Sequence, residues 1–493
     1  MRAHRTSLFV AALAVAAAGA CRAQEPPPAL LARLAAIDSA VVRVGAAHPD
    51  AIWPGFRPDT VPVLYVVPDQ GTLLLDWPAP EPPAGFTPVA GVAHAGWQGA
   101  AARSAASTSA SLAGRSAAQV VVSPDATDAL LFGTTVHEAF HVFERSRARQ
   151  GRRFGSGENS FLVSSYPVFD ARNEAAFALE GRLLARALAA PTTAAAREAA
   201  QEFVAAREAR QRRLASEFAD FETQTELNEG LAEYALVRVL QLAESDPALP
   251  WRADAAGEIR RHTDRLDSLT ANVRQSLRFR FYATGPAMGL LLDRLAGPAW
   301  RATLERDDLT LQEALAEASG YRDRERALLA RAARAVDTAA LDRDARGAIA
   351  RLRALRRVQT DSILAEPGLL VVLRADSLPG HGFGLCGIDP QNLLQVDSTV
   401  LLHTRWVRPC AGGFSGEFTA PAIQDRAAGT FTAVVGAEDS VSLTTAGKPV
   451  ALREGVGVVV PDFKLVAPGA TLEVARAALR RTGRTLEVDP LAR

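Results

Sequence analysis

The sequence predicts a protein of several domains: a small N-terminal unit of mixed α/β structure (29–125), a mainly α-helical middle domain (126–364) and a β-rich C-terminal domain (365–493). Three observations support this fold class. The chain of 493 residues is longer than a single domain with one hydrophobic core usually is. Apolar residues recur at helical spacing through the middle of the chain. Near Pro367 this pattern gives way to short apolar runs broken by Gly, Pro and Asp.

The first 23 residues are typical of a secretory signal peptide. Arg2, His4 and Arg5 precede an apolar run over 8–20 that ends in small residues, and this run is too short to span a bilayer. We therefore expect an exported protein (periplasmic, outer-membrane-associated or extracellular) without a transmembrane helix in its mature form.

The end of this segment is compatible with two kinds of processing. Residues 18–21, Ala-Gly-Ala-Cys, resemble a bacterial lipobox, which would make Cys21 the site of a lipid anchor. Ala18 stands where leucine is usual, and ordinary cleavage after Ala20 or Ala23 fits the same residues. Both outcomes stay open at this point.

The N-terminal unit is predicted to combine one helix with several strands. Residues 30–44 have apolar side chains at helical spacing. The runs 61–67 and 71–75 are strand-like and enclose a turn of Pro, Asp, Gln and Gly. Two further strands are expected over 107–113 and 118–122, joined around a glycine.

The C-terminal domain is predicted from a series of short apolar runs. We expect strands within 369–374, 394–406, 429–435, 441–445 and 456–460. Cys386 and Cys410 are the only cysteines after the signal segment. In an oxidising compartment we expect a disulfide between them, and two free buried thiols are the alternative.

The charge balance argues against a nucleic-acid partner. Lys+Arg and Asp+Glu each number 55, so the formal net charge is zero. The many arginines over 322–357 alternate with Asp and Glu, a pattern typical of a solvated helix face.

The strongest functional signal is the pattern His-Glu-x-x-His formed by His137, Glu138 and His141. Histidines four residues apart lie on one face of a helix, so both imidazoles can reach one metal ion. Glu138 between them can accept a proton from the attacking water. The alternative is a helix with two incidentally spaced histidines.

A hydrolytic zinc site needs a third protein ligand and an open position. Glu144 lies seven residues beyond His137, about 10 Å along the helix axis, and is too distant to share the metal with both histidines. The ligand is therefore expected from another helix. Four carboxylates without interleaved Lys or Arg form a candidate stripe at helical spacing: Glu222, Glu226, Glu229 and Glu233.

The pattern His-Glu-x-x-His followed far downstream by Asn228, Glu229 and Glu233 resembles the gluzincins, the thermolysin-like zinc metallopeptidases. Residues 229–234, Glu-Gly-Leu-Ala-Glu-Tyr, are more similar still to bacterial families of the peptidase-MA type. The resemblance implies a Zn²⁺ cofactor held by His137, His141 and Glu229. It also implies that Glu233 accepts an imidazole N–H bond, that of His137.

The chain departs from thermolysin in the long segment between His141 and Glu229, which contains Asn173 and Glu174 as well as a rival ligand, Glu180. Glu229 is preferred because it alone has a carboxylate one turn further on. We recognise no family over the C-terminal domain.

Three residues are candidates to stabilise an oxyanion: Tyr282, His262 and Tyr234. Tyr282 precedes a helix start that similar families place near their site, with core packing as the alternative. His262 lies among Arg and Asp residues and is expected on the surface.

Together these features predict an exported zinc metallopeptidase with a gluzincin-like catalytic domain, in which Glu138 is the general base and the substrate is a peptide or protein. An edge strand over 107–113 or 118–122 is expected to align an extended substrate. Two alternatives remain: a zinc hydrolase of a non-peptide bond, and an envelope binding or assembly protein with a silent site. The intact Glu138 argues against a silent site.

Overall fold

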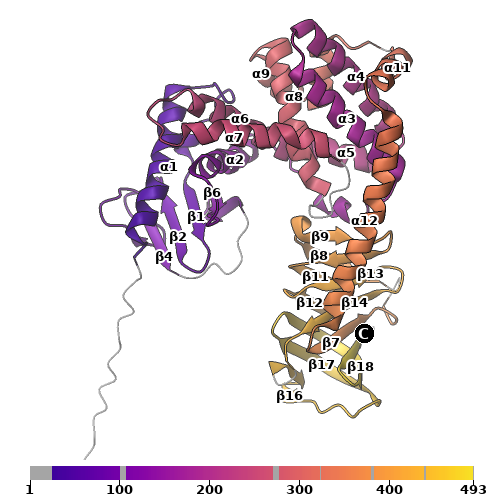
Figure 1. The fold of residues 1–493 in the computed structure, drawn as a ribbon. Coiled ribbons are helices and arrows are strands. Elements are labelled where there is room, and N and C mark those ends of the chain that lie inside the picture. Colours follow the sequence, from indigo (N-terminus) through magenta and orange to yellow (C-terminus); the bar gives the residue numbers. More distant parts are fainter. Residues whose placement is uncertain are drawn as a thin grey trace, which may run out of the picture.

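The structure is a computed structural model that describes residues 25–99, 107–269, 277–322, 324–378, 382–437 and 440–491. The predicted signal peptide and Cys21 lie outside these residues. The expected order of a mixed α/β unit, a helical middle region and a β-rich C-terminal region is confirmed (Figure 1). Within the described part of the chain, no helix is long and apolar enough to cross a membrane.

The N-terminal unit is a six-stranded sheet with two helices on one face. The strands follow the order β3-β4-β2-β1-β6-β5, in which β1 and β6 are parallel and the other pairs antiparallel. Alternate residues of β1, such as Tyr65, face α1 (Pro28–Ala47) and α2 (Asp128–Arg147), while Leu64 faces a smaller cluster on the other side. The strands are β1 (Val63–Val67), β2 (Gly71–Leu75), β3 (Thr87–Pro88), β4 (Gly96–Gly99), β5 (Thr108–Leu112) and β6 (Arg115–Val121).

The helix and four strands expected in this unit are present as α1, β1, β2, β5 and β6. The short strands β3 and β4 were not predicted, because their two and four residues are too few for a periodic pattern. A tight turn at Ala113 and Gly114, both at positive φ, joins β5 to β6. This hairpin leaves β5 at the edge of the sheet as the structure describes it.

The middle region is helical, and its helices form two groups in contact with each other, one around α2 (Asp128–Arg147) and one around α4 (Thr193–Gln211). Thr127 caps α2 by accepting a hydrogen bond from the Leu130 N–H. α2 lies between strand β6 and helix α6, and most of its side chains are buried. The other helices are α3 (Ala171–Ala189), α4 (Thr193–Gln211), α5 (Ser216–Thr225), α6 (Leu231–Glu244), α7 (Arg252–Asp264), α8 (Phe281–Ala296), α9 (Trp300–Asp307), α10 (Leu311–Ser319), α11 (Glu325–Ala335) and α12 (Thr338–Ala365).

A π-helical turn, Glu226–Gly230, joins α5 directly to α6. It contacts α8 through two glycines: a Cβ placed on Gly230 would lie 2.8 Å from the Cα of Gly285, and one on Gly285 would come closer still. Because neither residue has a side chain, the two backbones approach much more closely than helices usually do. This contact sets the distance between α8 and the turn.

As far as the structure describes it, the C-terminal domain is a sheet of thirteen strands, with α12 running along it (Figure 1). The run expected over 394–406 forms two strands, because Asp397 caps a turn between them. The long hairpin of β17 and β18 extends well beyond the expected 456–460. The strands are β7 (Leu369–Arg374), β8 (Gly384–Ile388), β9 (Leu393–Gln395), β10 (Val400–His403), β11 (Val407–Ala411), β12 (Phe414–Phe418), β13 (Ala422–Asp425), β14 (Thr430–Val435), β15 (Ser442–Thr445), β16 (Lys448–Pro449), β17 (Gly457–Ala467), β18 (Ala470–Thr482) and β19 (Thr485–Pro490).

Two kinds of contact attach this domain to the helices. The side-chain amide of Gln395 donates to the carbonyl oxygens of Val163 (2.8 Å) and Tyr166 (2.9 Å). Leu393 and Leu401 are buried in the same core as the helical region.

Cys386 on β8 and Cys410 on β11 form a disulfide, the pairing expected from the sequence.

We expect Gly285→Ala to destabilise the fold by about 1–3 kcal/mol, because the added methyl group has to push the π-helical turn away from α8. The measurement is the free energy of unfolding in urea. Gly257→Ala is the matched control: a Cβ there meets only the end of the Arg260 side chain, at 4.0 Å. Alanine should leave the stability of α7 unchanged or raise it by about 0.5–1 kcal/mol. Equal effects of the two substitutions would contradict the close contact.

Candidate functional site

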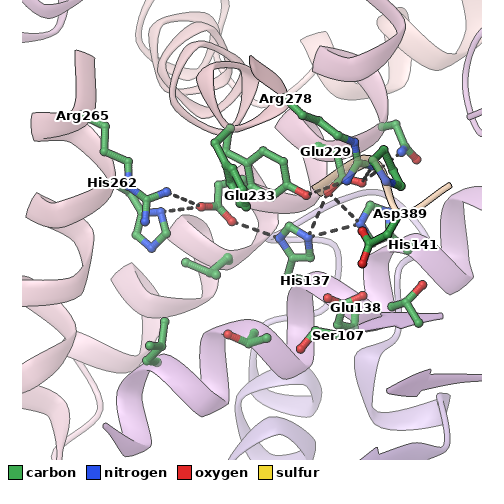
Figure 2. A pocket seen from close by; sticks show the side chains of 18 of the residues that line it. Ser107, His137, Glu138, His141, Glu229, Glu233, His262, Arg265, Arg278 and Asp389 are labelled. Atoms are coloured by element: carbon green, nitrogen blue, oxygen red, sulfur yellow. Dashed lines mark hydrogen bonds and ion pairs between the residues drawn. The ribbon is translucent and has the colours of Figure 1, made fainter. Parts of the chain in front are cut away.

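A cleft of about 790 Å³ lies where the three parts of the chain meet. Ser107 and Thr108 at the start of β5 line one side, and helices α2, α6, α7 and α8 supply the floor. Residues 388–390 and 405–406 of the C-terminal domain form a further wall. All the side chains that the sequence assigns to the metal site line this cleft (Figure 2).

α2 contributes His137, Glu138 and His141, all more than nine-tenths buried. The two Nε2 atoms lie 3.2 Å apart, so the imidazoles converge as the four-residue spacing predicts. These three residues form a group whose potential ligand atoms all lie within 4.8 Å of one another.

Glu229, from the π-helical turn, brings its carboxylate to the histidines. Its Oε2 lies 3.5 Å from Nε2 of His137 and 3.4 Å from Nε2 of His141. The pairing of these three side chains, expected from the sequence, is therefore present in the structure (Figure 2). π-Helical turns are rare and frequent at functional sites.

The π-helical turn divides the stripe of four carboxylates that the sequence places on one face. Glu229 and Glu233 face the histidines, whereas Glu222 and Glu226 are buried against arginines of α4. The widened turn adds a residue to the helical repeat and so rotates the second pair relative to the first. The expectation of a single stripe was wrong for Glu222 and Glu226.

Glu233 lies behind His137 and does not contact the Nε2 side of the ring. Its Oε2 is 3.0 Å from His137 Nδ1, and its Oε1 is 2.6 Å from His262 Nδ1 and 3.3 Å from Arg265 Nη1. Burial by itself raises a carboxyl pKa, but His262 and His137 outweigh it and hold the pKa of Glu233 far below its usual value. Glu233 is thus placed to fix the His137 tautomer.

The expectation that His262 lies on the surface was wrong, since only 4 % of the residue is exposed. Ala255, Glu258 and His262 are all buried and occupy positions i, i+3 and i+7 of α7. This spacing marks the inner face of the helix. In the sequence this spacing is hard to recognise, because charged residues surround His262.

Glu144, which is too far along α2 to be a ligand, supports His141 instead. Its Oε2 lies 3.3 Å from His141 Nδ1, at the i, i+3 spacing that brings helical side chains together. Each imidazole therefore has a carboxylate on its Nδ1 and presents Nε2 to Glu229. Burial alone would lower the pKa of His137, but Glu229 and Glu233 raise it to about 9. The site thus attracts positive charge.

Arg278 is a site residue that the sequence analysis does not identify. Its Nη2 donates to Glu229 Oε1, and its Nε donates to Glu158. Asn228 Nδ2 donates to the same Glu229 oxygen at 3.2 Å. These donors leave Oε2 turned towards the histidines. Although burial opposes it, the charges of His141 and Arg278 hold the pKa of Glu229 well below its usual value.

Of the three residues considered for an oxyanion, Tyr282 is the one with a hydroxyl in the cleft. Its ring stacks on His137, with ring centroids 5.9 Å apart and an interplanar angle of 17°. Burial, with the charge of Glu229, raises the pKa of Tyr282 well above its usual value, so the hydroxyl keeps its proton at neutral pH. Tyr234 lies outside the cleft lining, and its hydroxyl donates to Asp293 at 2.8 Å.

Glu138 faces the cleft beside the histidines (Figure 2). Its Oε2 is buried and has no hydrogen-bond partner among the described residues. Burial raises the pKa of Glu138 above its usual value, although His137 and His141 act in the opposite direction. A buried carboxylate with one free oxygen is suited to accept a proton from a molecule bound in the cleft.

The rival ligand Glu180 belongs to a separate buried ion network. Its oxygens accept from Arg207 Nε at 2.9 Å and Arg210 Nε at 2.5 Å. Its carboxylate therefore faces arginines of α4 and does not take part in the histidine cluster. Asn173 likewise accepts a hydrogen bond from Arg210, and Glu174 accepts one from Arg280.

The disulfide lies close behind the C-terminal wall of the cleft. β8 leads from Cys386 to residues 388–390, and β11 leads back from Cys410 to Trp406. A Cβ placed on Gly387 would lie 2.5 Å from the Trp406 ring, so only glycine lets the indole pack there. The disulfide therefore joins the two segments that line this side.

Comparisons with known proteins identify no relative of this chain. No protein-family model, curated protein or solved structure matches the chain.

We expect Glu180→Gln to lower the free energy of unfolding by about 3–5 kcal/mol, because it leaves two fully buried arginines short of a negative charge. Urea denaturation measures this change. Glu198→Gln is the control, since Glu198 pairs with Arg331 at the surface and its side chain is 61 % exposed. The control should change stability by less than about 0.5 kcal/mol. Similar values for both variants would mean that the network contributes little.

Proposed function

We propose that this protein is an exported zinc metallopeptidase of the gluzincin type. The observation that carries the proposal is the convergence of His137 Nε2, His141 Nε2 and Glu229 Oε2 beside the free carboxylate oxygen of Glu138. The resemblance of both sequence motifs to gluzincins adds to it.

The donor atoms fit a zinc ion in number, type and spacing. In a tetrahedral site with bonds of about 2.0–2.1 Å, neighbouring ligand atoms lie about 3.3–3.4 Å apart. The three separations here are 3.2, 3.4 and 3.5 Å. Two imidazoles and one carboxylate leave a fourth position for a reacting molecule, as in catalytic zinc sites. The carboxylates on both Nδ1 atoms favour the tautomer whose Nε2 binds a metal.

Zinc bound here would supply Lewis-acid chemistry, polarising a substrate carbonyl and making water more acidic. Glu138 would take the proton of the attacking water on its free oxygen and transfer it to the leaving amine. Tyr282, which keeps its proton, would donate a hydrogen bond to the carbonyl oxygen as negative charge develops there.

A peptide substrate is favoured over other hydrolysable substrates by the edge strand β5. Its first residue, Thr108, and the adjacent Ser107 line the cleft beside Glu138. β5 has no second strand partner among the described strands. An extended peptide can add to such an edge through backbone hydrogen bonds, which selects peptide chains over compact molecules. Hydrolysis of a non-peptide bond at the same metal is the second candidate function.

Export is proposed from the signal-like residues 1–23 and from the disulfide, since disulfides persist in oxidising compartments.

We expect purified protein to contain about one zinc ion per chain, and Glu229→Ala to lose most of it because a direct ligand is removed. Glu233→Ala should lower metal affinity by about 10–100-fold, and Glu233→Gln by less because one acceptor oxygen remains. Elemental analysis and competition with a chromophoric chelator measure these effects. Glu198→Gln serves as the control. If Glu233→Ala lost more zinc than Glu229→Ala, the two roles would have to be exchanged.

We expect Glu138→Gln to abolish peptide hydrolysis and retain zinc, because this carboxylate moves a proton and is not a ligand. The test is digestion of a broad peptide library followed by mass spectrometry, with zinc content measured on the same sample. Removal of zinc from the unmodified protein by a chelator should also stop cleavage, and added zinc should restore it. Undiminished hydrolysis by the Glu138→Gln variant would exclude the proposed mechanism.

A further inference from the structure

Among the residues that the structure describes, one arginine of the cleft has no carboxylate partner. Four arginines line the cleft, and three of them have carboxylates beside them. These are Arg265 with Glu233 at 3.3 Å, Arg278 with Glu158 and Glu229, and Arg405 with Asp389 at 4.0 Å. The fourth, Arg145, has no carboxylate within ion-pair distance in the part of the chain that the structure describes.

Arg145 stands on the same face of α2 as the histidines. His137, His141 and Arg145 follow one another at intervals of four residues, so each lies about one turn further along the helix. Arg145 is exposed and lines the same cleft. Since no carboxylate of the described residues lies within ion-pair distance, the guanidinium of Arg145 is available to an anionic group of a molecule bound in the cleft.

A basic side chain near the C-terminus of a helix stabilises that end. Arg147 already provides such a side chain in the last turn of α2, so this role alone does not explain Arg145. Arg147 lies 3.4 Å from Glu305 and stacks over the Phe143 ring at 5.0 Å. It lines a different hollow, on another side of the helix. Two arginines of one helix turn therefore have different surroundings, and only Arg145 faces the candidate site.

We propose that Arg145 binds a carboxylate group of the peptide substrate, so that the enzyme prefers acidic peptides; this inference rests on the proposed peptidase function. Arginine binds carboxylates through two parallel N–H donors, which fixes orientation as well as charge. Four residues of helix advance about 6 Å, close to two residues of an extended peptide at about 3.3 Å each. The bound carboxylate thus lies within about two residues of the cleaved bond.

Two sources supply this chemistry: an Asp or Glu side chain, or the carboxylate at the C-terminus of the peptide. The first readout is binding, measured by calorimetry with the full-length zinc-loaded Glu138→Gln variant. The probes are octapeptides that differ only by Glu or Gln at one of the positions next to the cleaved bond, each with a free or an amidated C-terminus. The second readout is KM and kcat of the active protein for the same peptides.

We expect Arg145→Gln to weaken binding of the preferred acidic peptide about tenfold and to leave binding of its neutral counterpart unchanged. Arg145→Lys should restore part of the affinity, and added salt should reduce the preference. Arg147→Gln should have no effect. Loss of the preference on amidation identifies the C-terminal carboxylate as the ligand, and loss on Glu→Gln exchange identifies the side chain.

The two proposals fail in different ways. Cleavage of peptides without any preference for acidic ones, or an equal effect of Arg145→Gln on acidic and neutral peptides, overturns the inference about Arg145 alone. Binding of acidic peptides that depends on Arg145 but leads to no hydrolysis overturns the peptidase proposal and supports this one. The absence of measurable binding of any acidic peptide overturns the inference as well.

Discussion

The buried ion pair between Arg207 and Glu226 holds the turn on which the candidate site depends. Arg207 Nη1 donates to both oxygens of Glu226 at 2.8 and 2.7 Å, and Thr284 on α8 donates to the same carboxylate. Both charged side chains are almost completely buried, so an unpaired partner would be costly. This pair fixes the first residue of the π-helical turn, and Glu229 lies three residues further on.

The same turn is fixed at its other end by the glycine contact with α8. Gly230 touches Gly285 on α8, and Tyr282 lies one turn before Gly285 on the same helix. The contact that positions Glu229 therefore also positions the tyrosine that stacks on His137. The Glu229 carboxylate, the Tyr282 side chain and the His137 imidazole are therefore held in one arrangement by helix packing as well as by their own contacts.

The sequence predicts the parts of this arrangement that follow from short-range geometry. His137 and His141 converge because any helix places residues four apart on one face, and the same spacing links Glu229 to Glu233. The residues that sequence reasoning missed depend on long-range contacts. Arg278 follows a segment that carries no periodic signal, and it reaches Glu229 from a distant part of the chain.

The π-helical turn could not be foreseen either, because the residues of Glu226–Gly230 are compatible with an ordinary α-helix. Its consequence is that Glu222 and Glu226 leave the site, which no count of helical positions reveals. The order of the three regions was predictable because it depends on local periodicity. The position of the C-terminal loops in the cleft was not, since it depends on how β9 and β10 dock on the helices.

The position of β5 at the edge of the described sheet has a second consequence. A strand edge with free backbone groups can pair with the same strand of another molecule, and proteins commonly protect such edges. Here the C-terminal loops at 388–390 and 405–406 line the cleft into which the start of β5 faces. A cleft of this size admits one extended chain more readily than the folded sheet of a neighbouring molecule. At the start of β5, the wall that limits what enters the cleft would thus also hinder pairing with the sheet of a second molecule.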